Sequence, residues 1–285
     1  MPLFRGAVLI SFMLAIFSAP AFSDNPDILL LKQRLQGPVS GAHQGGLSST
    51  RMNTLPNFES ARKAGVTVVE MDLRISKDGI PVVFHDEKLR PWTVCYGPVR
   101  NKTVEQLQRD CPFNHGAIIS SFEEILRWAQ GRVVVNAEFK DEETIVPAIQ
   151  LVQKYAAYSW VYFQTQGSWQ KYKLARDTDS EVALLFSPKN EPDFFLAVNT
   201  TDPNLIIIEV DKRWDDPNYI DAIHASGKLA SVDSFDYDFT KELLIASCSE
   251  AFKRKIDIAI SNRPESCQKQ ATSARRPLVR TLASQ

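Results

Sequence analysis

The sequence predicts an α/β protein whose parallel strands close into a (β/α)8 TIM barrel. About eight short apolar segments alternate with helical ones, which is the order that parallel strands joined by helices require. About 260 residues follow the predicted leader, a length typical of one such barrel. Polar side chains also stand at the carboxyl ends of several apolar segments, where barrels of this class carry their chemistry. Together these observations favour a barrel over a doubly wound sheet.

The chain opens with a pattern typical of secretory signal peptides. A short basic start precedes an apolar run from Ala7 to Phe17, and small residues follow, with cleavage expected after Ala21 or Ser23. An uncleaved anchor or a buried helix is the alternative, but the run is shorter than the roughly 20 residues of a spanning helix. We expect 1–23 to be removed and 24–285 to form a single exported domain, periplasmic or secreted, with no transmembrane segment.

Charge and cysteine content limit the class of protein further. The net charge is −1, so the chain lacks the basic field of nucleic-acid-binding proteins. Cys95 and Cys111 bracket a loop-like segment, and a bridge between them would close a loop of about 17 residues. Cys248 and Cys267 form the remaining pair. Free buried thiols are the alternative, and the absence of Cys-x-x-Cys gives no sign of a zinc site.

Cap and turn residues divide the first part of the chain. Thr54 is the expected N-cap of a helix that has Pro56 in its first turn and Gly65 after its end. The run Lys77-Asp78-Gly79 predicts a tight turn between two strands. The expected elements are a helix at 28–35, an extended segment at 38–42, a helix at 54–64, and strands at 66–73 and 80–84.

The same alternation continues to the end of the chain. Ser120 or Ser121 is the expected cap of a helix that stops at Gly131. The expected strands are 132–140, 160–164, 182–186, 205–210, 229–232 and 256–260, and the expected helices are 121–130, 143–155 and 218–225.

Glu70 and Asp72 place two carboxylates in a strand that should be buried. Because side chains alternate along a strand, these two share one face while Val69, Met71 and Leu73 share the other. If the apolar face packs against helices, two adjacent charges on the opposite face are unfavourable unless a cation or a proton neutralises them. The pair therefore predicts a metal site, with exposure on an edge strand as the alternative.

Other polar residues end neighbouring strands. Glu138 and Lys140 share one face of the strand at 132–140, while His43 and His85 directly follow the strands at 38–42 and 80–84. Three acids and a lysine should therefore converge on one mouth of the barrel. A solvated ion pair is the alternative for Glu138 and Lys140.

These residue types favour a particular chemistry. Three carboxylates without cysteine favour a hard divalent cation, Ca²⁺ or Mg²⁺, which would polarise a phosphoryl oxygen. His43 and His85 would act as general base and acid, because imidazole titrates near neutral pH. Lys140 would supply a positive charge for the phosphate. The prediction is metal-assisted cleavage of a phosphodiester.

The chain resembles the glycerophosphodiester phosphodiesterase family over most of residues 39 to 265. The resemblance is carried by Ala42-His-Gln-Gly45, Asn53-Thr54, Glu70-x-Asp72, Lys77-Asp-Gly79, Val83-x-His-Asp86, Gly97-Pro-Val, Thr103-Val-x-x-Leu107, Glu138-x-Lys140 and Ile258-Ala-Ile-Ser-Asn-Arg-Pro264.

The resemblance implies a phospholipase-C-like phosphodiesterase barrel. It implies acid-base roles for the histidines, a Ca²⁺ or Mg²⁺ ion on Glu70, Asp72 and Glu138, and a role for Asp86 in orienting its neighbours from just outside the site. It also implies a deacylated phospholipid as substrate, cleaved to an alcohol and glycerol phosphate. A neighbouring substrate hydroxyl is one possible attacking group, which would give a cyclic phosphate first.

The chain departs from this family in ways that bear on substrate choice. Gln44 and Met52 stand where the family usually has arginine and glutamate, and the usual aromatic residue is not evident at 231–234. Gln44 remains a candidate phosphate contact, although a neutral amide grips phosphate less strongly than an arginine fork. Two alternatives therefore stay open: a phospholipase D-like enzyme acting on intact lipid, and a non-catalytic barrel that binds phosphodiesters or lipids.

Two further histidines and three tryptophans are expected to have structural roles. His115 and His224 are expected to be structural or solvated, because one lies in the predicted disulfide loop and the other near a helix end. Trp92, Trp169 and Trp214 loosely follow predicted strands. Packing is their expected role, and a lipid-facing mouth is the alternative.

Overall fold

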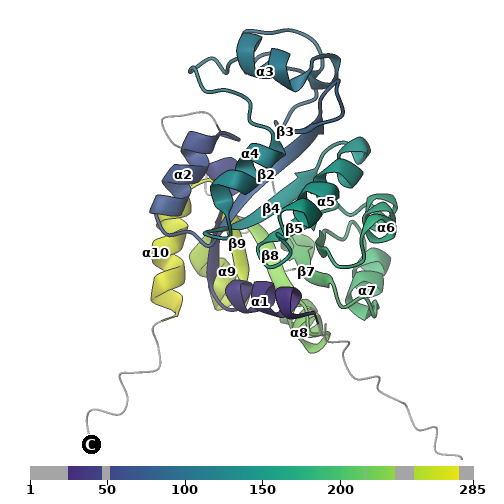
Figure 1. Ribbon diagram of the computed structural model, residues 1–285. Coiled ribbons are helices and arrows are strands. Elements are labelled where there is room, and N and C mark those ends of the chain that lie inside the picture. Colours follow the sequence, from purple (N-terminus) through teal and green to yellow (C-terminus); the bar gives the residue numbers. More distant parts are fainter. Residues whose placement is uncertain (1–24, 47–51, 215, 235–246, 276–285) are drawn as a thin grey trace, which may run out of the picture.

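The computed structural model describes residues 25–46, 52–214, 216–234 and 247–275. Eight parallel strands close into a barrel with helices between them (Figure 1), which confirms the predicted fold class. In order around the barrel, the strands are β1 (Val39–Ala42), β2 (Val68–Ile75), β4 (Val134–Phe139), β5 (Val161–Gln164), β6 (Ala183–Phe186), β7 (Leu205–Val210), β8 (Leu229–Ser234) and β9 (Ile258–Ser261). Strand β1 pairs with both β2 and β9, so the sheet has no open edge.

Helices that surround the barrel begin where the cap residues indicate. Leu55 opens its helix directly after Thr54, and Ser121 forms a capping box with Glu124 at the start of another. The helices near predicted positions are α1 (Pro26–Leu35), α2 (Leu55–Lys63), α4 (Phe122–Ala129), α5 (Ile145–Lys154) and α8 (Pro217–Ala225). Those not predicted are α3 (Val104–Asp110), α6 (Trp169–Thr178), α7 (Glu191–Asn199), α9 (Cys248–Lys253) and α10 (Pro264–Ala274). Short 3-10 turns are η1 (His43–Gly45), η2 (Val99–Asn101), η3 (Glu142–Thr144) and η4 (Lys212–Trp214).

Strand β2 has the two faces that its alternation predicts. Val69, Met71 and Leu73 are fully buried in the layer between the barrel and its surrounding helices. Val68 belongs instead to the apolar cluster inside the barrel. The barrel interior is therefore where Glu70 and the residues that alternate with it must lie.

Helix α1 closes the end of the barrel at which the strands begin. Its buried side chains Ile28, Leu31 and Leu35 join Val39 and Val134 in the interior apolar cluster. In Figure 1, α1 lies at the far end of the barrel from α3. An apolar floor thus lies beneath the polar interior residues.

Residues 84–120 form an insertion that precedes α4 in the sequence. It follows β3 (Pro81–Val83), which lies outside the barrel and pairs antiparallel with β2 across the turn that Lys77-Asp78-Gly79 predicts. The insertion contains α3 and has a small apolar core that includes Leu89, Leu107 and Phe113. In Figure 1 it projects beyond one end of the barrel.

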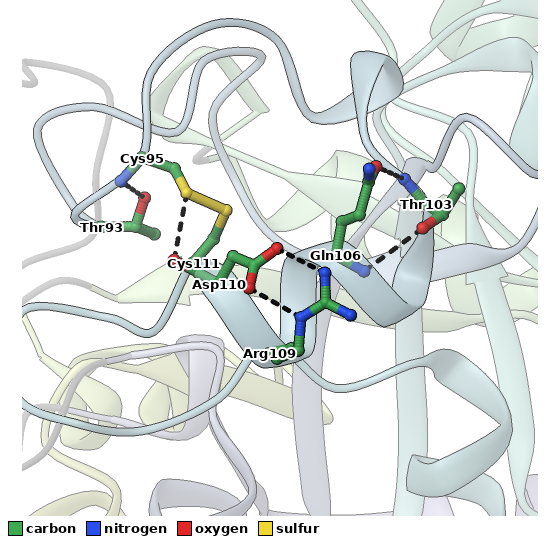
Figure 2. The surroundings of a disulfide bond; sticks show 7 residues. All are labelled: Thr93, Cys95, Thr103, Gln106, Arg109, Asp110 and Cys111. Carbon is green, nitrogen blue, oxygen red and sulfur yellow. Dashed lines mark hydrogen bonds and ion pairs between the residues drawn. A yellow bond between two sulfur atoms is a disulfide. The ribbon is translucent and has the colours of Figure 1, made fainter.

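Both expected disulfides are present. Cys95 and Cys111 bridge the insertion with an S–S distance of 2.05 Å (Figure 2), and Cys248 and Cys267 join α9 to α10 at 2.02 Å. The predicted signal peptide lies outside the described residues. Within the described ranges, no helix is long and apolar enough to cross a membrane.

Candidate active site

Three carboxylates meet inside the barrel at its carboxyl end. Glu70 and Asp72 come from β2, Glu138 comes from β4, and the strand register sets Asp72 beside Glu138. One oxygen from each carboxylate lies within 4.8 Å of the others, and all three groups are buried. The structure therefore brings together the three acids that the sequence predicts as metal ligands.

The electrostatics of these carboxylates favour a cation. Burial raises the pKa of Glu70 well above its ordinary range, and the charges of Asp72 and Glu138 raise it further. Burial and Asp72 likewise raise the pKa of Glu138. Negative charges held together away from water are stabilised by a proton or a metal ion. The all-oxygen donor set fits a hard divalent cation.

Lys140 lies directly against two of these acids. Its Nζ is 3.0 Å from Asp72 Oδ1 and also contacts Glu138 Oε1. Burial lowers the pKa of Lys140, but the Asp72 and Glu138 carboxylates outweigh it and raise the pKa above its usual range. Lys140 is therefore a fixed positive charge beside the carboxylates, rather than half of a solvated surface pair.

His43 begins η1, immediately after β1. Its Nδ1 lies 2.7 Å from Asn262 Oδ1, which can only accept, so Nδ1 carries the proton and Nε2 is left as a base. Burial lowers the pKa of His43, and this effect exceeds the opposing effect of Asp233. The next residue, Gln44, donates its backbone N–H to Glu70 Oε2 at 2.7 Å. The turn after β1 thus holds the His43 imidazole through Asn262 and the Glu70 carboxylate through the Gln44 backbone N–H.

His85 follows β3 and is held at two points. Its Nδ1 lies 2.6 Å from Asp86 Oδ1. The guanidinium of Arg74 donates to the His85 carbonyl at 3.0 and 2.8 Å and also pairs with Asp141 at 2.7 Å. Asp86, which the sequence predicts to orient its neighbours, lies in direct contact with the His85 imidazole.

The structure adds amide side chains that the sequence argument did not assign. Asn53 donates to Asp72 Oδ2 at 2.6 Å and accepts from the Asp72 backbone N–H at 3.2 Å. Gln166 donates to Glu138 Oε1 from the loop after β5. Asn53 and Asn262 lie in segments that carry the family resemblance, so the sequence could have identified them as site residues. Gln166 lies in a loop whose course no local pattern predicts.

A fourth interior acid was also missed. Glu209 on β7 accepts hydrogen bonds from Gln164 at 3.1 Å and Ser187 at 2.5 Å. Burial raises its pKa well above the ordinary range, and Asp233 raises it further. Glu209 stands in an apolar strand just as Glu70 does, so the same reasoning applied to β7 would have found it.

The remaining candidates lie apart from the carboxylates. His115 is exposed in the insertion, and His224, in the last turn of α8, pairs with Asp257 at 2.8 Å. Trp169 and Trp214 pack against aromatic neighbours, as expected. Trp92 differs, because its indole Nε1 donates to Asp86 Oδ2.

Similarity to known proteins agrees with this arrangement. Residues 43–265 match the family model described as "Glycerophosphoryl diester phosphodiesterase family". The chain belongs to this family. Glycerophosphoryl diester phosphodiesterases with solved structures share its fold: one from Parabacteroides distasonis has a TM-score of 0.69 at 19% identity, covering 85% of this chain and 92% of that one.

Two further relatives of the glycerophosphoryl diester phosphodiesterase family are similar in sequence. A probable glycerophosphodiester phosphodiesterase 2 of Mycobacterium tuberculosis is 29% identical over 148 residues, covering 52% of this chain and 55% of the relative. A glycerophosphodiester phosphodiesterase of Bacillus altitudinis is 34% identical over 117 residues, covering 38% of this chain and 48% of the relative. The chain thus spans about half the length of these curated relatives.

Proposed function

We propose that the protein is a divalent-cation-dependent phosphodiesterase that cleaves glycerophosphodiesters to an alcohol and glycerol phosphate. The observation that carries this proposal is the convergence of Glu70, Asp72 and Glu138 inside the barrel, with His43 directly after β1 and His85 just after β3. The names of the family and its relatives support it. An Oleispira antarctica phosphodiesterase of similar fold, with a TM-score of 0.67 at 18% identity, is known in complex with the product sn-glycerol-3-phosphate.

Glu70, Asp72 and Glu138 would hold the cation, Ca²⁺ or Mg²⁺. Their fit rests on oxygen donors within 4.8 Å and on the raised pKa values that like charges and burial produce. When bound, the cation polarises a phosphoryl oxygen and offsets the charge that grows in the transition state. Asn53 and the Gln44 backbone N–H orient two of the carboxylates by hydrogen bonds.

His43 is the proposed general base. Its Nδ1 proton is committed to Asn262, and burial keeps the ring neutral, so Nε2 can take a proton from the attacking hydroxyl. That hydroxyl belongs to water or to the neighbouring carbon of the glycerol group, and the second case gives a cyclic phosphate first. Lys140, fixed beside Asp72, supplies positive charge for the phosphate oxygens.

His85 is the proposed general acid. The Asp86 carboxylate accepts from Nδ1, which orients the ring and directs Nε2 toward a second partner. The Nε2 proton then passes to the oxygen of the departing alcohol. Phe84, the residue before His85, donates its backbone N–H to the Asp72 carbonyl at 3.0 Å, which holds His85 beside the strand that carries Asp72.

A metal-titrated assay of glycerophosphocholine hydrolysis tests this function. We expect release of glycerol phosphate to require Mg²⁺ or Ca²⁺ and to fall by about 10²- to 10⁴-fold in His43→Ala and in His85→Ala. His115→Ala is the matched control, because this histidine is exposed and apart from the carboxylates. Normal turnover by both active-site variants would overturn the proposed mechanism.

The phospholipase D-like alternative remains tied to Gln44. This residue is buried beside Glu70 and offers a neutral amide where the family usually has arginine. If the alternative holds, intact choline lipids should yield choline or a phosphorylated lipid, and glycerophosphocholine should be a poor substrate. Binding of diesters with no product from any of them would favour the non-catalytic barrel.

We also propose that the chain is exported. The signal-peptide pattern at 1–23 supports this, and so do two disulfides, which persist in oxidising compartments. Secretion in a bacterial host, followed by amino-terminal sequencing of the mature protein, tests it. An intact leader in a cytoplasmic protein would contradict it.

A further inference from the structure

The contact between Trp92 and Asp86 connects the insertion to the proposed general acid. The two oxygens of Asp86 have different partners: Oδ1 accepts from His85 Nδ1 at 2.6 Å, and Oδ2 accepts from Trp92 Nε1. A carboxylate bound at both oxygens is fixed in its plane. The indole therefore sets the direction from which Asp86 meets the imidazole.

The pair needs such support because it is exposed. The side chains of His85 and Asp86 are 46% and 35% exposed, so their own hydrogen bond competes with water and with free rotation. The Arg74 contacts hold the His85 carbonyl but leave the ring free to turn about its side-chain bonds. A second contact on Asp86 reduces the number of ring orientations.

Trp92 is itself held by the insertion. Its backbone N–H donates to Leu89 at 3.1 Å, and its carbonyl accepts from the Asn114 N–H at 3.0 Å. The next residue, Thr93, pairs with Phe113 in an isolated bridge. Figure 2 shows the disulfide that closes this loop from Cys95 to Cys111, with the Cys95 N–H donating to Thr93 Oγ1 at 3.1 Å.

We propose that Trp92 is a positioning residue for the proposed reaction: its indole N–H fixes Asp86, which in turn fixes the His85 ring so that Nε2 faces the departing alcohol. This inference rests on the proposed function, because it needs His85 to act as the acid. It gives the insertion a role in catalysis without any contact between Trp92 and the substrate. A small error in the position of a proton donor is enough to slow transfer strongly.

Trp92→Phe tests the proposal, because it removes the N–H and keeps an aromatic ring. Trp128→Phe is the matched control, since the Trp128 indole also donates to a carboxylate, Glu59, at 3.1 Å away from the active site. Replacing Trp92 with 3-benzothienylalanine removes the N–H at nearly constant shape. This variant separates the hydrogen bond from packing if Trp92→Phe proves unstable.

The readout is the dependence of rate on the leaving group. Choline leaves poorly without a proton, whereas p-nitrophenolate leaves unaided, so only glycerophosphocholine needs the acid. For Trp92→Phe we expect kcat to fall about tenfold on glycerophosphocholine and less than about twofold on glycerol p-nitrophenyl phosphodiester, with KM unchanged. Equal losses on both substrates, no loss, or the same pattern in Trp128→Phe would overturn the proposal.

Nuclear magnetic resonance of the His85 ring tests the positioning step without turnover. We expect a resolved Nδ1 proton signal in the wild type and in Trp128→Phe, and a broadened or lost signal in Trp92→Phe. An unchanged signal would overturn the positioning role even if the enzyme is active. Failure of wild-type hydrolysis would instead refute the proposed function, and the proton signal would still report whether Trp92 holds the ring.

Discussion

Lys140 is the residue whose charge should affect cation binding and catalysis in opposite directions. Its Nζ lies 3.0 Å from Asp72 Oδ1 and also contacts Glu138, so it repels a cation held by these carboxylates. We expect Lys140→Met to bind Mg²⁺ or Ca²⁺ about tenfold more tightly and to lose roughly 10²-fold in kcat. Titration calorimetry and initial rates measure the two effects.

Lys173→Met provides the control for this experiment. Lys173 is exposed and pairs with Asp177 on α6, so its removal should change neither quantity. Weaker cation binding in Lys140→Met would mean that Lys140 organises the carboxylates more than it repels the ion.

Gln44 is the residue where this chain departs most directly from its family. The backbone N–H bond from Gln44 to Glu70 does not depend on the side chain, so a replacement leaves it in place. An arginine adds a charged fork, and we expect Gln44→Arg to lower KM for glycerophosphocholine about tenfold. Met52→Glu restores the other residue that the family usually has. Comparing kcat/KM of both variants on glycerophosphocholine and on intact choline lipid shows whether these two positions set the substrate preference. A raised KM in Gln44→Arg would show that the neutral amide suits the natural substrate.

Elements with strong periodicity could be predicted, and those without it could not. Strands β2 and β4 carry acids at alternate positions, so their register alone brings Asp72 beside Glu138. Helix α6 was missed because its inner face consists mainly of the partly buried aromatic residues Trp169 and Tyr172, and Ala175 is its one fully buried residue. Contacts made by Gln166 and Trp92 depend on the course of loops, which only the folded chain determines.

Helix α1 should contribute to stability through the barrel floor. Leu31 is fully buried in the interior apolar cluster, while its neighbour Leu30 is 47% exposed. We expect Leu31→Ala to lower the free energy of unfolding by about 3 kcal/mol, through lost transfer energy and a cavity. Leu30→Ala should change it by less than about 0.5 kcal/mol. Urea denaturation compares the two, and equal losses would contradict the role of α1 as a floor.

The two disulfides should differ in their effect on catalysis. Their sequence separations are 16 and 19 residues, so removal of either should lower stability by a similar amount, about 3 kcal/mol in the chain-entropy model. Only the Cys95–Cys111 bridge lies in the insertion that carries Trp92 and its backbone partners. We expect the double alanine variant of Cys95 and Cys111 to lower kcat on glycerophosphocholine, and that of Cys248 and Cys267 to leave it unchanged. Identical kinetics in the two would contradict this difference.

At the scale of the whole molecule, the barrel concentrates negative charge above an apolar floor. Acids from β2, β4 and β7 share one interior, and burial raises the pKa values of Glu70, Glu138 and Glu209. Carboxyl groups with raised pKa values bind more protons in the folded state than in the unfolded state. Their contribution to stability is therefore full below the unfolded value, near 4.5, and is lost as pH rises through the raised folded values.

We expect this charge arrangement to make stability depend on pH and on the proposed divalent cation together. Without the cation, we expect stability to fall from about pH 5 upward, because the buried carboxylates must then ionise side by side. A cation at 100 times its Kd adds about 2.7 kcal/mol, which raises Tm by roughly 5 to 10 °C for a domain of this size. The gain should be larger at pH 8 than at pH 5, since protons compete for the same oxygens.

Calorimetric scans of two variants distinguish the stability gained from the proposed cation from the stability lost when interior carboxylates ionise. Glu138→Gln removes a ligand of the carboxylate cluster and should abolish the rise in Tm, whereas Glu209→Gln removes a buried acid outside that cluster and should retain it. Glu209→Gln should also flatten the loss of stability above pH 5, because one fewer group then ionises in the interior. A rise in Tm that survives Glu138→Gln would place the cation elsewhere in the molecule.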